Sequence, residues 1–270
     1  MEQDDTVFAG SIPLLYEECL VPLIFEPYAV DLARRVHERN PRRVLELAAG
    51  TGVVTRAMAE TLPVDTRIVA TDLNPAMLEQ ARIIGALRPV EWRQADAMAL
   101  PFADGGFDAV VCQFGAMFFP DKARAFAEAR RVLKPGGTFL FNVWDRIDEN
   151  EFADAVGDAL GQVFPDDPPR FMARTPHGYH DVAAIARDLA EAGFASAPRI
   201  ETLAFRCRAE SPRVVAIAYC QGTPWRNEIE ARDASGLDAA TDAAEAEIAR
   251  RFGHGTVSGR MQAHVVEIAA

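Results

Sequence analysis

The chain has 270 residues, of which 49% are hydrophobic and 25% charged, so we expect a packed globular fold that needs no disulfides. Its formal net charge of −12 argues against nucleic acids and anionic membranes as partners, because both are bound mainly through Lys and Arg. The acidic start and the lack of a long apolar run predict a cytoplasmic protein without a membrane span.

The cysteines are scattered, with no CxxC pair and no metal-like spacing. This pattern predicts free thiols and no metal site. The four positions are Cys19, Cys112, Cys207 and Cys220.

The first part of the chain predicts one or two helices over Tyr16 to Arg39, interrupted at Pro22 and Pro27. We interpret residues 1–40 as a helical lid. Residues 41–144 then alternate short apolar runs with helical patterns, which is typical of βαβ units around a parallel sheet. The strands predicted here are residues 43–47, 67–71, 90–95, 107–112 and 138–144.

Local signals place two helices between these strands. Asn74 suits the N-cap of one helix and Pro75 its first position. A second helix should begin near Asp121, and the sequence at residues 134–137, Lys-Pro-Gly-Gly, predicts its end.

After Trp144 the pattern becomes mainly helical, and residues 145–197 are predicted to form a helical insertion in a single domain of residues 1–270. Two further strands bring the expected sheet to seven. The helices are expected at 151–164, 181–192, 212–220 and 237–252, the strands at 199–208 and 257–268, and connections at 222–225 and 253–255.

A glycine turn follows the first predicted strand at Gly50 and Gly52. Small residues let the backbone approach a ligand there, and the N–H groups of the next helix point toward it. As a dinucleotide fingerprint the match is imperfect, because Thr55 takes the place of the third glycine. A tight turn without a ligand is the alternative interpretation of this motif.

Acidic residues follow the next two predicted strands. Asp72 comes about twenty residues after Gly52, the spacing at which a carboxylate accepts hydrogen bonds from ribose hydroxyls. Asp96 and the amide of Ala97 follow the third strand, where the edge of an adenine could be recognised. Because the carboxyl ends of parallel strands share one edge, we expect these groups in one crevice.

Five motifs in register resemble those of class I S-adenosylmethionine-dependent methyltransferases, in the branch of the ubiquinone- and menaquinone-biosynthesis enzymes. The resemblance implies an α/β, Rossmann-like, doubly wound seven-stranded sheet with an antiparallel last strand and an added helical cap. It also implies methyl transfer from S-adenosylmethionine to a small-molecule acceptor, leaving S-adenosylhomocysteine. The motifs are Glu46–Gly52, Thr71–Leu78, Gln94–Phe102, Phe107–Phe114 and Val132–Gly137.

The same resemblance implies a role for each matching residue. The methionyl part of the cofactor would lie against Ala48, Gly50 and Gly52, with Glu46 beneath the loop. Asp72 would hold the ribose. Ala48 stands where the family more often has glycine. The remaining expected contacts are Leu73, Met77, Asp96 and Ala97 around the adenine, Gln113 and Phe114 toward the sulfonium, and Tyr16 closing over the cofactor.

Methyl transfer is an in-line displacement, so alignment and exclusion of water matter more than any one catalytic group. A base is needed only for an acceptor that must lose a proton. His177 is the candidate base, beside the weaker candidates Asp145, Tyr179 and His180. Aromatic side chains that could line an apolar acceptor pocket are Tyr16, Phe25, Phe118, Phe119, Trp144 and Phe171.

Other classes of function stay open at this stage. A nicotinamide-dependent oxidoreductase also combines a glycine turn with a ribose-binding acid. A protein that binds S-adenosylmethionine without turnover is another alternative. The acceptor atom is not predicted, and exposed helices after Trp144 suit a homodimer.

Overall fold

The computed structural model describes residues 5, 10 and 12–270, so part of the predicted lid lies outside the described residues. The described residues form a sheet with the predicted seven strands, in the order β3-β2-β1-β4-β5-β7-β6. Neighbouring strands from β3 to β5 are parallel. The strands are β1 Arg43–Glu46, β2 Arg67–Asp72, β3 Glu91–Gln94, β4 Phe107–Gln113, β5 Leu133–Trp144, β6 Arg199–Ala209 and β7 Val257–Ala269.

The last strand runs against its neighbour β5. The N–H of Gly136 donates to the carbonyl of Ala270, whereas the N–H of Asp145 donates to the carbonyl of Gln262. Residue numbers therefore fall along β7 as they rise along β5, which is the antiparallel pattern. The antiparallel last strand implied by the resemblance is confirmed.

The chain divides into two compact units. We call the unit that contains most of the strands the sheet unit, and the other the helical unit. The five motifs all lie in the sheet unit, whereas the predicted cap segment 145–197 is shared between the units. The sheet unit comprises Glu26–Val143, Tyr179–Leu203 and Ala263–Ala270, and the helical unit comprises Met1–Phe25, Trp144–Gly178 and Ala204–Gln262.

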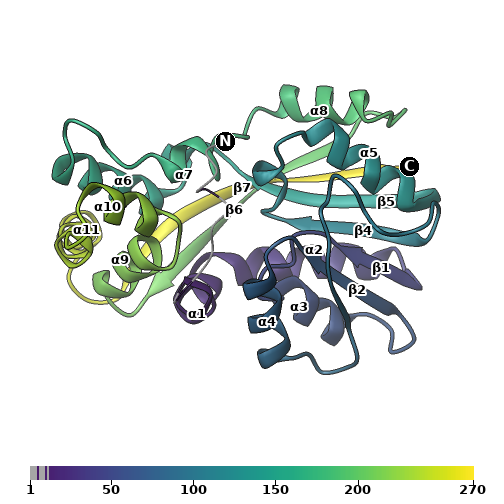
Figure 1. Cartoon of the computed structure of the whole chain (residues 1–270), viewed down its shortest axis with the longest axis horizontal. Coiled ribbons are helices and arrows are strands. Elements are labelled where there is room, and N and C mark those ends of the chain that lie inside the picture. The colour runs from purple at the N-terminus through teal and green to yellow at the C-terminus, as the bar shows by residue number, and fades with distance from the viewer. Residues whose placement is uncertain (1–4, 6–9, 11) are drawn as a thin grey trace. The chain divides into compact units, whose positions relative to one another are not determined.

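Helices cover both faces of the sheet in the sheet unit. On one face lie α2 Glu26–Glu38, α3 Val53–Thr61 and α4 Pro75–Ile84, and on the other lie α5 Lys122–Val132 and α8 Val182–Glu191 (Figure 1). This is the doubly wound arrangement that the motifs predict. One buried cluster joins helices and strands through Leu32, Val36, Val44, Val54, Met58, Ile68, Val111 and Leu140.

Capping signals in the sequence correspond to the observed helix starts. The Asn74 side chain accepts the N–H of Ala76 at the start of α4, and the Asp121 side chain accepts the N–H of Arg124 at the start of α5. α5 ends at Val132, directly before the predicted stop signal, but β5 begins at Leu133 and not at residue 138, so residues 134–137 lie in the strand. Pairing of this segment with Ala270 at the end of β7 accounts for the difference.

Most of the helices whose bounds or presence differ from the sequence prediction lie in the helical unit. Pro22 lies inside η2, a π-helix, and Pro27 in the first turn of α2, where proline is tolerated, so the predicted interruptions are wrong. The predicted connection at 222–225 leads into a further helix at Trp225. The elements are α1 Ile12–Leu15, η2 Tyr16–Phe25, η4 Ile147–Glu149, α6 Glu151–Val163, α7 Phe171–Arg174, α9 Pro212–Gln221, α10 Trp225–Arg232 and α11 Leu237–Phe252 (Figure 1).

Candidate functional site

The glycine loop is held by backbone hydrogen bonds to two strands of the sheet unit. The N–H of Leu47 donates to the carbonyl of Val111 on β4, and the N–H of Ala49 donates to the carbonyl of Thr71 on β2. Gly52 has a φ of +88°, and a Cβ at this position would stand 2.7 Å from the ring of Trp92 on β3. The loop therefore needs glycine at position 52 both for its backbone conformation and for its contact with Trp92.

Ala48 adopts a φ of +50°, a left-handed conformation in which an alanine is strained. This is the position where the family more often has glycine, so the departure noted in the sequence carries a backbone cost. The methyl group of Ala48 also restricts a neighbour: a Cβ added to Gly115 would stand 2.5 Å from the Cβ of Ala48. The two positions are therefore coupled by packing.

Asp72 closes the loop from the end of β2. Its Oδ2 accepts the N–H of Gly50 at 2.7 Å and its Oδ1 accepts the N–H of Asn74 at 2.8 Å. Burial raises the pKa of this carboxyl group, while the backbone donors oppose the rise. A carboxylate has about four lone-pair sites, so these backbone donors do not occupy all of them.

Glu46 lies beneath the loop with 1% of its surface exposed. Burial raises its pKa to about 8, although the hydroxyl of Thr55 donates to its Oε2. Thr55, which replaces the third glycine of a dinucleotide fingerprint, thus has a specific partner. Beside it, the hydroxyl of Thr51 is buried without a hydrogen-bond partner among the described residues, so the loop contains one polar group that a ligand could satisfy.

The predicted adenine contacts differ in exposure. The side chain of Leu73 is 58% exposed, whereas Met77 is buried on the inner side of α4. The Asp96 side chain accepts the N–H of Met98 in a turn after β3, and Ala97 is half-buried. Leu73, Asp96 and Ala97 thus remain accessible to a ring, and Met77 is mainly a core residue.

The end of β4 is fixed by an amide that the sequence analysis missed. Asn142 on β5 is fully buried; its Oδ1 accepts the N–H of Phe114, and its Nδ2 donates to the Oε1 of Gln113 at 3.4 Å. Phe114 has a φ of +49°, an uncommon conformation for an aromatic residue, and its ring meets the edge of Tyr28. An Asn within an otherwise apolar strand is the signal that could have identified this support.

The helical unit brings together four of the residues predicted on the acceptor side. The rings of Tyr16 and Phe25 stack at 5.1 Å, Phe25 lies 6.0 Å from Trp144, and Trp144 lies 6.0 Å from His177. Phe171 is buried in α7 of the same unit. Phe118 and Phe119 belong to the sheet unit, so the predicted aromatic set is distributed over two units.

His177 is buried, and its Nδ1 lies 2.7 Å from the carbonyl oxygen of Asp145. A carbonyl only accepts, so Nδ1 carries the hydrogen of this contact. The carboxylate of Asp145 accepts from Gln262 and from the N–H of Arg146. The contact with the Asp145 carbonyl holds the orientation of the His177 ring.

The other predicted bases are less suited to that role. The hydroxyl of Tyr179 donates to Asp188 at 2.5 Å, and burial together with this carboxylate raises its pKa well above the ordinary value. His180 is half-buried just before Asp181, whose side chain caps α8.

Burial also raises the pKa of the Cys112, Cys207 and Cys220 thiols to about 12, which agrees with free, unreactive cysteines.

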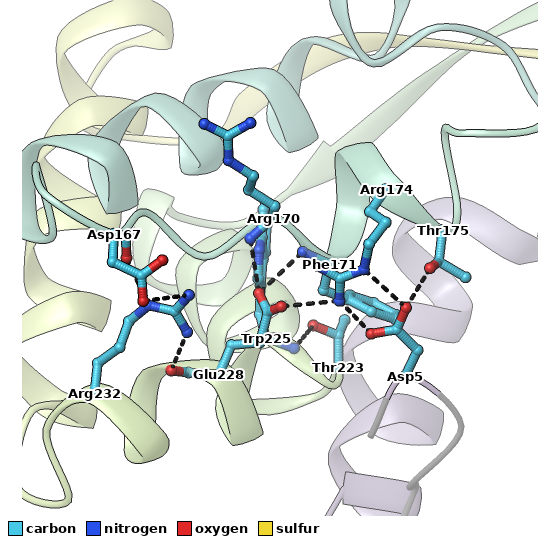
Figure 2. Close-up of polar contacts among 10 residues, drawn as sticks. All are labelled: Asp5, Asp167, Arg170, Phe171, Arg174, Thr175, Thr223, Trp225, Glu228 and Arg232. Atoms are coloured by element: carbon cyan, nitrogen blue, oxygen red, sulfur yellow. Dashed lines mark hydrogen bonds and ion pairs between the residues drawn. The ribbon is translucent and has the colours of Figure 1, made fainter. Parts of the chain in front are cut away.

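A charge network in the helical unit was not predicted from the sequence. Asp5 is 2% exposed and accepts from the guanidinium of Arg174 and the hydroxyl of Thr175 (Figure 2). Glu228 accepts from Arg174 as well, and from the N–H groups of Arg170 and Phe171 at the start of α7. This network connects three segments of the chain.

No group of three or more His, Cys, Asp or Glu side chains in the described part of the chain could hold a metal ion. Within residues 5, 10 and 12–270, no helix is both long and apolar enough to span a membrane.

The core of the sheet unit is similar to a known protein family. Residues 45–141 match the model of a methyltransferase domain, which covers about a third of the chain. The matched segment includes the glycine loop, Asp72, Asp96 and Gln113, and the match confirms the resemblance drawn from the five motifs.

Two curated relatives and one solved structure are similar to the chain. A demethylmenaquinone methyltransferase of Thermus thermophilus is 46% identical over 114 residues, covering 42% of this chain and 50% of the relative. A ubiquinone/menaquinone biosynthesis C-methyltransferase of Klebsiella pneumoniae is 42% identical over 106 residues, covering 38% and 42%. The chain thus spans about half the length of the curated relatives it matches.

The fold likeness extends further than the sequence likeness. A Haemonchus contortus phosphoethanolamine N-methyltransferase, solved with S-adenosylhomocysteine and phosphomonomethylethanolamine, has a TM-score of 0.61 at 15% identity, covering 98% of this chain and 59% of that one. At this identity the likeness supports the Rossmann-like fold alone. Together the comparisons favour the methyltransferase prediction over the oxidoreductase.

Proposed function

We propose that this chain transfers the methyl group of S-adenosylmethionine to a small-molecule acceptor and releases S-adenosylhomocysteine. The observation that carries the proposal is the position of Asp72, which closes the glycine loop inside the methyltransferase domain and keeps lone pairs for ribose hydroxyls. The unpartnered Thr51 hydroxyl in the same loop also fits a bound polar ligand.

Different residues of the sheet unit would bind different parts of the cofactor. Asp72 would hold the ribose, Asp96 and the Ala97 amide the adenine, and the loop from Ala48 to Gly52 the methionyl part. Gln113, oriented by Asn142, would face the sulfonium end. The cofactor supplies an electrophilic methyl group, and the chain's own contribution is alignment and exclusion of water.

For the acceptor we propose an apolar, aromatic molecule of the phenol or quinol class. The adjoining rings of Tyr16, Phe25 and Trp144 support this class, as do the curated relatives, one of which is a demethylmenaquinone methyltransferase. His177, held by the carbonyl of Asp145, would orient such a molecule or take its proton. The acceptor atom stays open.

We also propose that the protein works in the cytoplasm and as a homodimer. The net charge of −12 is consistent with a partner that is neither nucleic acid nor an anionic membrane.

Calorimetric titration tests the cofactor first, with S-adenosylmethionine and S-adenosylhomocysteine as ligands and NAD as the control. We expect one site per chain with micromolar affinity for the adenosyl ligands and none for NAD. A second assay follows methyl transfer to reduced naphthoquinones and small phenols by mass spectrometry. Absence of adenosyl-ligand binding in folded, cofactor-free protein contradicts the proposal, and binding without any transfer identifies a protein that holds the cofactor without turnover.

A further inference from the structure

The strand β3 lies at the end of the sheet, so its outer edge is not paired with another strand of the described residues. The N–H of Ala95, just after β3, donates to the carbonyl of Asp72 on the inner side. Because peptide groups alternate along a strand, those of Trp92 and Gln94 point outward. A long contact from Arg82 to the carbonyl of Trp92, at 3.4 Å, agrees with this direction.

The side chains of β3 are self-complementary. Glu91 and Arg93 are both exposed and lie on one face of the strand, on either side of Trp92. If a second β3 ran antiparallel to the first and centred on Trp92, Glu91 would stand opposite Arg93 of the partner subunit. The two-fold axis would create this pair twice.

The N–H and C=O groups of β3 point in the directions that this register requires. In an antiparallel pair, residues directly opposite each other exchange both hydrogen bonds only where their N–H and C=O groups face the partner. Trp92 is at the centre of the register, and its peptide groups point outward. The two Glu91–Arg93 pairs would then occupy the closer, non-hydrogen-bonded positions, where opposite charges interact best.

Exposed apolar side chains lie beside this edge in sequence. Among the described residues nine large apolar side chains are exposed, and three of them fall within residues 83–87, at the end of α4 and just before β3. Ile83 is 71% exposed and Leu87 is 81% exposed. Apolar surface next to an unpaired strand edge is typical of an interaction site.

We propose that two copies of this chain associate by antiparallel pairing of their β3 strands, centred on Trp92, with Glu91 of each copy opposite Arg93 of the partner subunit. A second copy is the occupant because the charge order of the strand complements itself under a two-fold rotation. The surface differs from the helices after Trp144 that the sequence suggested for a dimer.

Sedimentation equilibrium of the full chain over a range of protein concentrations tests this surface. We expect a reversible dimer whose dissociation constant rises about tenfold or more in Glu91→Arg and in Arg93→Glu, because each change places like charges opposite each other twice. The double variant E91R/R93E should restore the dimer. An equimolar mixture of the two single variants should form a heterodimer, since one copy then carries two Arg and the other two Glu.

A matched control makes the same charge change at a position away from β3. Glu210→Arg alters the net charge as Glu91→Arg does, at an exposed position of the helical unit, and should leave the dissociation constant unchanged. Thermal melts verify that all variants are folded. A wild-type chain that is monomeric at every concentration overturns the proposal, as expected if the charged residues protect a short edge strand. A dimer that tolerates both single reversals, or that the double variant fails to restore, overturns it as well.

Discussion

The glycine loop of the sheet unit and the charge network of the helical unit differ in how far apart in the sequence their partners lie. In the loop, Thr55 contacts Glu46 nine residues earlier, and Asp72 contacts Gly50 from the neighbouring motif. In the helical unit, Asp5 contacts Arg174 and Asp154 contacts Arg251. The sheet unit also contains such distant pairs, as between Arg35 and Glu201. Short motifs can therefore specify the loop, whereas no sequence window contains the distant pairs of either unit.

The largest effect expected in the sheet unit concerns Glu46 and pH. With a folded pKa of about 8 against an ordinary 4.5, the folded protein keeps a proton that the unfolded chain releases. The stabilisation is complete below about pH 4.5 and is lost as the pH rises through 8, a decrease on the order of 4 kcal/mol in the free energy of unfolding. Glu46→Gln should remove this slope.

Urea unfolding at several pH values between about 5 and 8.5 measures the slope. Glu60→Gln, an exposed change on α3, is the matched control and should keep the wild-type slope. Parallel pH profiles for wild type and Glu46→Gln would show that Glu46 is ionised in the folded state.

Asp72→Ala tests whether the cofactor depends on the sheet unit. Loss of the carboxylate should weaken S-adenosylhomocysteine binding about 100-fold, close to 3 kcal/mol, because charged hydrogen bonds to two hydroxyls disappear. It should also lower stability, since the N–H groups of Gly50 and Asn74 lose their acceptor. Calorimetry measures the affinity, with the exposed change Glu79→Gln as control. Unchanged affinity would remove Asp72 from the site.

Asp5→Ala is the corresponding test of the helical unit. Removing one partner of a buried charge network should cost about 2–3 kcal/mol of stability, because Arg174 and Thr175 lose a buried acceptor (Figure 2). Asp148→Ala, which breaks an exposed pair with Arg146, should cost no more than about 1 kcal/mol. Hydrogen exchange should localise the loss to the helical unit. Equal costs for the two variants would contradict a structural role for the network.

The smallest effect concerns the packing of Ala48 against Gly115. Gly115→Ala should cost about 2 kcal/mol, because its new methyl group would overlap the Cβ of Ala48 and the Sγ of Cys112. Ala48→Gly should add up to about 1 kcal/mol by relieving the left-handed alanine. In the double variant the cost of Gly115→Ala should be smaller. Strictly additive urea-unfolding free energies would exclude the coupling.

Local sequence predicted much of the sheet unit because its determinants are local. The caps at Asn74 and Asp121 each contact an amide within three residues, and the Asp72–Gly50 contact follows from two adjacent parallel strands. The start of β5 was missed because residues 134–137 pair with Ala270 at the far end of the chain. Asn142 was missed because its function depends on the neighbouring strand β4.

In the helical unit, prediction failed for the same reason, because the structure depends on contacts beyond the local sequence. Pro22 predicts a break in the helix, yet it lies inside a π-helix. The network at Asp5 joins residues about 170 positions apart, which periodicity does not detect. What the sequence did find there, the rings of Tyr16, Phe25 and Trp144 beside His177, came from residue type alone and not from spacing.

The contact between Trp92 and Gly52 gives the protein an intrinsic optical probe. Of the three tryptophans, Trp144 and Trp225 are almost completely buried, whereas Trp92 is half-buried and its ring lies against the glycine loop. Indole emission depends on polarity and on nearby groups, so the fluorescence of a chain with Trp144 and Trp225 replaced by Phe would come from Trp92 alone. Loop ordering, and the state of the β3 edge to which Trp92 belongs, could then be followed in real time without any label.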